Sequence, residues 1–123
     1  MFEEFEVKRF SLKRRERKVI LETENGGERV CFIREMDGRN RDAFTSRNSA
    51  RFIVNDKGVI VGMKSYDGQY ALLLSLCMFD EEDKLLDIKE IQTFPSSVQQ
   101  ELHDIAQKLN WINLDGEEKA KNA

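Results

Sequence analysis

The chain has 123 residues, of which 40% are hydrophobic and 35% charged, with a net charge of −3. This length and balance indicate one globular domain with a single core and a heavily charged surface. The first ten residues lack the apolar core of a signal peptide, and no apolar run reaches transmembrane length. We therefore expect a cytoplasmic protein without a membrane anchor.

Charge is distributed unevenly along the chain. Seven bases and one acid lie between Lys8 and Lys18, whereas eleven acids and five bases lie between Asp80 and Ala123. Such polarity can steer head-to-tail self-association or docking to a charged partner, although a solvated hairpin and a solvated acidic tail explain it equally well. The candidate docking surface consists of Lys13, Arg14, Arg15, Arg17 and Lys18. Nucleic-acid binding by this cluster is the weaker alternative, because the whole protein is acidic and contains no nucleic-acid motif.

The N-terminal third predicts an antiparallel sheet. Residues 18–23 are apolar and β-branched, Asn25-Gly26-Gly27 is a turn sequence, and residues 28–35 alternate. Together they predict a β-hairpin over residues 18–35. Residues 5–12 alternate imperfectly, and we expect them to add the third strand.

The middle of the chain predicts two helices. Asp37 can cap a helix that runs to about Phe52, and the Asp56-Lys57-Gly58 turn then precedes a short strand or extended segment over residues 59–63. Asp67 can cap a second helix, from about Gly68 to Phe79. Apolar residues cover much of its surface, so we expect this helix to be central.

The last third predicts an acidic connector followed by an amphipathic helix. Residues 80–83 are all acidic, and a short turn follows over residues 88–91. Pro95 then suits the first turn of a helix, and Ser96 with Gln99 has the spacing of a capping box. The apolar positions of this helix form one stripe: Val98, Leu102, Ile105, Leu109 and Ile112.

These elements predict an α+β fold in a single domain over residues 1–112. An N-terminal three-stranded antiparallel sheet precedes about three helices, and residues 113–123 form a polar tail that we expect to be disordered.

The residue types give no reason to expect an enzyme, a cofactor or a metal. Cys31 and Cys77 occur in apolar runs and are expected to be buried hydrophobes in a reducing compartment. His103, the single histidine, lies one residue off the apolar stripe, so we expect it at the surface or its boundary. The acidic connector lacks the spacing and glycine of an EF-hand. Trp111 either closes the core or anchors a partner.

Two patterns in the chain point to a family. Arg34 to Asp42 reads Arg-Glu-apolar-X-Gly-X-X-Arg-Asp after a strand, and Leu76 to Asp80 reads Leu-Cys-apolar-apolar-Asp. An acidic turn, a proline-initiated helix and Leu109-Asn110 follow. Over about residues 30–112, this order resembles the tail assembly chaperones of long-tailed phages and prophages. Glu82-Asp83-Lys84 stands where those proteins often have Asp-Gly-Lys, which changes a turn and no essential residue.

The resemblance implies a non-enzymatic function. Such chaperones bind the long, aggregation-prone tape measure protein and keep it soluble while tail tube subunits polymerise around it. A helix of that partner can lie in an apolar groove between helices, and we expect self-association along it. The candidate partner-binding residues are Leu72, Leu76, Phe79, Leu102, Ile105, Leu109 and Trp111, several of which must instead form the core.

The family often makes a longer product by −1 frameshifting near the end of the gene. Ala120-Lys121-Asn122 can be encoded by GCA AAA AAC, which contains the slippery heptamer A AAA AAC. The resemblance thus implies a frameshifted form that could reach the tail tube protein. The alternative function is that of a tail structural or completion protein, which would remain in the finished virion.

Overall fold

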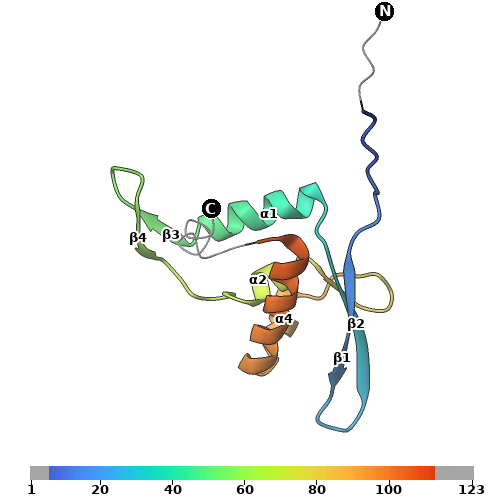
Figure 1. Cartoon of the computed structure of the whole chain (residues 1–123). Coiled ribbons are helices and arrows are strands. Elements are labelled where there is room, and N and C mark those ends of the chain that lie inside the picture. The colour runs from blue at the N-terminus through green and yellow to red at the C-terminus, as the bar shows by residue number, and fades with distance from the viewer. Residues whose placement is uncertain (1–5, 113–123) are drawn as a thin grey trace, which may run out of the picture.

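The computed structural model describes residues 6–112 and shows an α+β fold, as the sequence predicts (Figure 1). The strands are β1 (Glu16–Glu22), β2 (Glu28–Arg34), β3 (Phe52–Val54), β4 (Ile60–Met63) and β5 (Met78–Phe79). The helices are α1 (Gly38–Ser49), α2 (Ala71–Leu74), α3 (Ile88–Ile91) and α4 (Ser96–Asn110).

The predicted hairpin is confirmed, and its two strands begin a three-stranded antiparallel sheet in the order β1-β2-β5. The prediction of the third strand is wrong: β5 fills that place, with Ile33 paired to Met78, and residues 6–12 form no strand. Glu16 already pairs with Arg34, the last residue of β2. Residues before Arg15 therefore extend past the sheet, where β2 offers them no partner.

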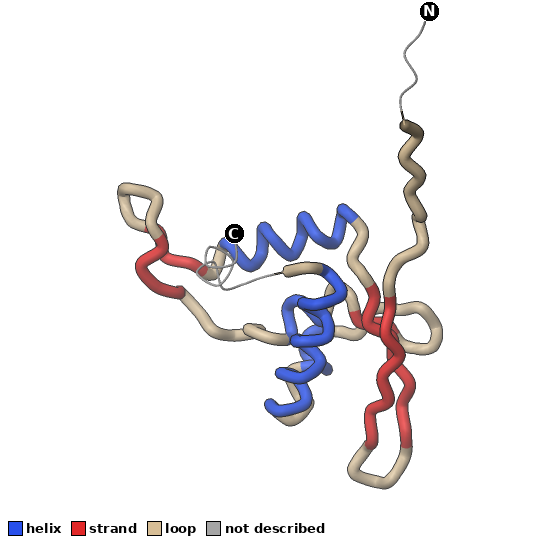
Figure 2. The backbone as a smooth tube through the Cα atoms, in the orientation of Figure 1, coloured by secondary structure: helices blue, strands red, loops and turns tan. Residues whose placement is uncertain are grey.

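Helix α1 begins as predicted, because the Asp37 carboxylate accepts a hydrogen bond of 2.8 Å from the backbone N–H of Asn40. It ends at Ser49, and residue 52 belongs to a strand rather than to the helix. Strands β3 and β4 form a second, two-stranded sheet around the predicted turn at residues 56–58. Figure 2 shows this hairpin projecting from the body of the molecule.

The predicted helix over residues 68–79 is wrong in length and in its cap. Tyr70 is the N-terminal cap of α2, which spans four residues, and residues 78–79 form β5. Gly68 has a φ of 72°, a left-handed conformation that does not belong to a right-handed helix. Residues 71–74 are all buried, so an extended helix here would need apolar cover on every side. The chain turns instead and uses Met78 to complete the sheet.

Helix α4 packs against β2 and α2, and the core lies between them. The predicted start of α4 is confirmed, but the capping box does not form, since Pro95 is the cap and no side chain bonds the first turn. The Gln99 side chain instead donates to the carbonyl of Phe94, at 2.9 Å. The largest fully buried side chains include Ile33, Leu73, Leu74, Met78 and Ile91.

The predicted polar tail, with Ala120 to Asn122, lies outside the described residues. Among residues 6–112, no helix combines the length and the apolar character needed to cross a membrane.

Candidate partner-binding groove

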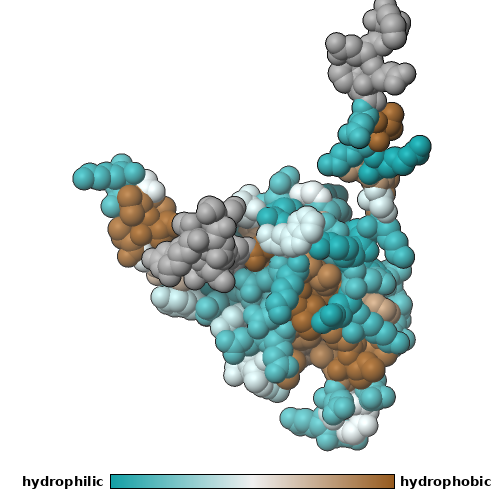
Figure 3. All heavy atoms as spheres, viewed as in Figure 1, coloured by the Kyte–Doolittle hydropathy of each residue, from teal (hydrophilic) through white to brown (hydrophobic). Residues whose placement is uncertain are grey.

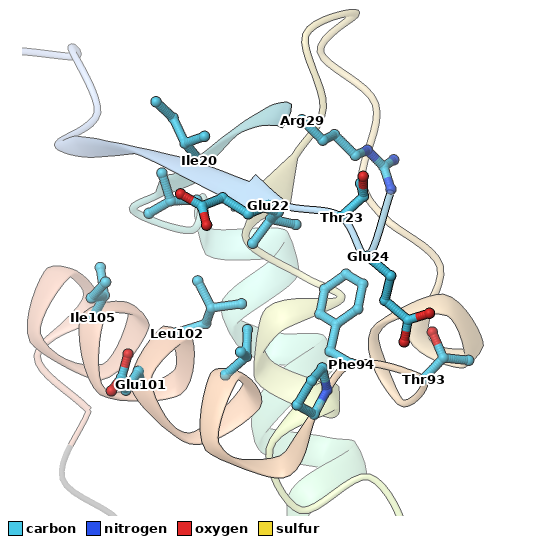
Figure 4. A pocket seen from close by; sticks show the side chains of 14 residues that line it. Ile20, Glu22, Thr23, Glu24, Arg29, Thr93, Phe94, Glu101, Leu102 and Ile105 are labelled. Carbon is cyan, nitrogen blue, oxygen red and sulfur yellow. The ribbon is translucent and has the colours of Figure 1, made fainter. Parts of the chain in front are cut away.

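A groove of about 690 Å³ lies between β1 and α4 (Figure 4). Its apolar lining comes from both elements and from the turn before α4: Val19, Leu21, Phe94, Val98, Leu102 and Ile105. Figure 4 shows Leu102 and Phe94 directed from the helical side toward the strand. The volume and mostly apolar wall are typical of sites that bind an apolar group from another molecule.

The groove exists because α4 does not bury its apolar stripe completely. The fully buried side of α4 comprises Leu102, His103, Ala106 and Asn110, which face the core. Only Leu102 belongs both to this side and to the predicted stripe. The other members of the stripe, Val98, Ile105, Leu109 and Ile112, are partly buried. Apolar surface of α4 is therefore left beside β1 with incomplete cover.

Acidic side chains line the polar part of the groove. Glu22 and Glu24 come from the end of β1 and the turn after it, and Glu101 comes from α4. Arg29 is the basic residue among the described residues that line the groove. It donates to the carboxylate of Glu90, which raises the pKa of Arg29. Because Arg29 is paired in this way, the three carboxylates give the groove a negative rim.

The structure divides the seven candidate partner-binding residues into three groups. Leu72, Leu76, Phe79 and Leu102 are buried, so their side chains belong mainly to the core. Ile105 lines the groove, and Leu109 is partly buried beside it. Trp111 is 78% exposed. Sequence reasoning missed Val19, Leu21 and Phe94; the alternation of Val19 and Leu21 on one face of a strand is the signal that indicates them.

Trp111 does not close the core. It ends α4 in the left-handed conformation, with a φ of 50°, and its ring lies 4.0 Å from the guanidinium carbon of Arg15. The same guanidinium donates to the carbonyl of Leu109. This cation–π contact orients the exposed indole beside the end of the helix.

The predicted basic docking surface is divided as well. Arg15 pairs with Glu35 as well as contacting Trp111, and Arg14 donates to the carbonyl of Glu35 at 3.4 Å. Lys13, Arg17 and Lys18 are exposed, and none of them forms an ion pair with another residue in the range 6–112. A partner can reach these three side chains, and Arg14 is exposed as well.

The residues that carry the family resemblance stabilise the fold. Arg34 pairs with Glu16 at 2.8 Å and with Asp83 at 2.9 Å. The buried Asn110 side chain accepts from the backbone N–H of Met36 at 2.6 Å, and Arg41 donates to the Asn110 carbonyl. These bonds hold the corner between β2 and α1 against the end of α4.

The buried titratable residues of the range 6–112 include Cys31, Cys77 and His103. Both cysteines are buried, as predicted, and burial raises the pKa of the Cys77 thiol to about 12. The prediction for His103 is wrong: it is buried, and its ring meets that of Tyr70 edge-on at 5.1 Å. The segment that carries Tyr70 covers this side of α4, which the helix pattern alone does not reveal. In residues 6–112, no group of three or more His, Cys, Asp and Glu is placed to hold a metal ion.

Comparisons with protein-family models, with curated protein sequences and with solved structures find no match to this chain.

Proposed function

We propose that this chain is a tail assembly chaperone of a long-tailed phage or prophage, acting in the cytoplasm of the bacterial host. It holds an amphipathic helix of the tape measure protein in the groove between β1 and α4. One observation supports this proposal above all: α4 leaves part of its apolar stripe uncovered beside Val19 and Leu21.

The physical basis is burial of apolar surface by both partners. A helix laid along α4 covers the exposed parts of Val98 and Ile105 and removes its own apolar side chains from water. Each Å² of apolar surface removed contributes about 25 cal/mol before the costs of association. The carboxylates of Glu22, Glu24 and Glu101 favour a helix whose apolar positions are flanked by Lys or Arg.

The test is co-expression of the tape measure protein with this chain and with Ile105→Glu. Ile105 is only partly buried and lines the groove, so Ile105→Glu places a charge in the groove. Leu102→Asp would instead place a charge in the core, because Leu102 is buried. The matched control is Leu12→Glu, because Leu12 is 95% exposed and lies outside the groove. We expect the unaltered chain and Leu12→Glu to keep the partner soluble, and Ile105→Glu to lower the soluble fraction several-fold.

Two outcomes would contradict the proposal. The first is a tape measure protein that stays insoluble with this chain in excess. The second is recovery of this chain from purified virions, since a chaperone leaves the tail and a structural protein remains in it. Contact of a frameshifted form with the tail tube protein stays a prediction.

A further inference from the structure

The β3–β4 hairpin exposes apolar side chains from both of its strands. Five of its residues are between 42% and 62% exposed: Ile53, Val54, Val59, Ile60 and Val61. Figure 3 shows this hairpin as a largely hydrophobic (brown) segment that projects from the body of the molecule, at the left of the view. An apolar patch of this kind on a soluble surface marks an interaction site.

The hairpin is well formed although little packs against it. At its tip, the Asn55 side chain accepts from the backbone N–H groups of Lys57 and Val59, at 2.9 and 3.0 Å. At its base, the N–H of Lys64 donates to the Arg51 carbonyl at 2.7 Å. Neither outer edge pairs with another strand of residues 6–112. Two strands alone have marginal stability in water, so a covering partner would stabilise this element.

We infer that the β3–β4 hairpin of one copy docks into the groove between β1 and α4 of a second copy. Opposite charges on the hairpin and in the groove favour this occupant. Between residues 52 and 64 the hairpin segment carries two exposed bases, Lys57 and Lys64, against one acid, Asp56. The groove presents three carboxylates. Pairing of two hairpins, in contrast, would bring like net charges together.

The arrangement of the elements requires that the two surfaces meet between copies. In Figure 1 the hairpin lies on one side of α1 and α4, and the β1–β2 hairpin that borders the groove lies on the other. Each copy therefore keeps one hairpin and one groove for neighbours, a head-to-tail contact that builds rings or chains of copies. β1 is also the outer strand of its sheet, so a docked strand can form backbone hydrogen bonds with it.

This inference stands apart from the proposed function, although it uses the same groove. A docked hairpin and a bound helix of the tape measure protein exclude one another. Self-association then covers the groove until a partner helix displaces the hairpin.

The test is a mixing experiment on the full chain, measured by sedimentation velocity. The hairpin variant is Ile60→Glu with Val61→Glu, the groove variant is Ile105→Glu, and the control is Leu12→Glu. We expect the unaltered chain and the control to form concentration-dependent oligomers, and each interface variant alone to weaken association at least tenfold. Mixing the two interface variants leaves one intact hairpin and one intact groove, so we expect a dimer that grows no further.

Three results would overturn the inference. They are a chain that stays monomeric at millimolar concentration, a groove variant that associates as strongly as the unaltered chain, and a mixture that forms no dimer although both variants have unaltered circular dichroism. Failure of the proposed function is separate, because the hairpin variant keeps its groove and should still solubilise the tape measure protein.

Discussion

At the scale of single residues, two turns of this chain have the same hydrogen-bond pattern but differ in the residue that adopts the left-handed conformation. In the turn from Asn55, one side-chain oxygen accepts from the N–H groups two and four residues ahead, and Gly58 has a φ of 79°. In the acidic turn, a carboxylate oxygen of Asp80 likewise accepts from the N–H groups two and four residues ahead. There the position that corresponds to Gly58 is occupied by Asp83, which has a φ of 61°. Left-handed backbone is unfavourable for residues with a Cβ atom. Asp83, which stands where the tail assembly chaperones often have glycine, is therefore in a strained backbone conformation.

Asp83→Gly should raise the free energy of unfolding relative to Asp83→Ala by about 1 kcal/mol, because glycine adopts this conformation freely. Both variants lose the ion pair with Arg34, so their difference reports the backbone alone. Midpoints of urea denaturation measure it. Equal midpoints would show that the turn is not strained.

His103 makes stability depend on pH. Burial lowers its pKa below 6.5, with a smaller opposing effect of Asp104, and its Nε2 atom has no hydrogen-bond partner among the described residues. Below pH 6.5 the unfolded chain binds a proton that the folded chain resists. The free energy of unfolding therefore has its full value above pH 6.5, and it falls as the pH drops from 6.5 toward the pKa of His103 in the folded chain.

In His103→Leu, this loss of stability between pH 7.5 and 5.5 should shrink, since leucine has a similar size and does not titrate. Denaturation at both pH values measures the effect. An equally large loss in the variant would assign the pH dependence to other groups.

At the scale of elements, local pattern predicted the elements whose partners are close in sequence. The β1–β2 hairpin and the start of α1 depend on a turn and on one capping side chain, and both are confirmed. The segment from Gly68 to Phe79 depends on distant partners. Its apolar run suits a helix or a buried strand, and the chain forms both: α2, and then β5 at the edge of β2.

The β3–β4 hairpin should be the least protected sheet in an isolated copy. In the groove variant Ile105→Glu, we expect backbone amides of Ile53 and Ile60 to exchange with deuterium much faster than those of β2, because few contacts hold the hairpin. In the self-associated chain, docking should slow their exchange. Hydrogen exchange followed by mass spectrometry compares the two, and fast exchange in both would argue against a docked hairpin.

At the scale of the whole molecule, the fold determines which of the unevenly distributed charges of the sequence remain available to a partner. Part of the N-terminal basic cluster is used internally, since Arg14 and Arg15 contact Glu35. The negative rim of the groove combines β1 and α4, which are distant in sequence. Binding of a nucleic acid by the basic cluster between Lys8 and Lys18 stays a prediction, and its mark would be affinity that falls steeply with salt.

The sequence by itself determined the α+β class, the first hairpin, the Asp37 cap of α1, the turn at residues 56–58 and the apolar stripe of α4, because each follows from neighbouring residues. Only the tertiary structure decided which side of α4 is buried. The cover supplied by Tyr70 drew His103 inward, and the edge of β2 drew Met78 into the sheet. Those contacts join residues far apart in the chain. They leave Ile105 beside Val19 in a groove that no local pattern contains.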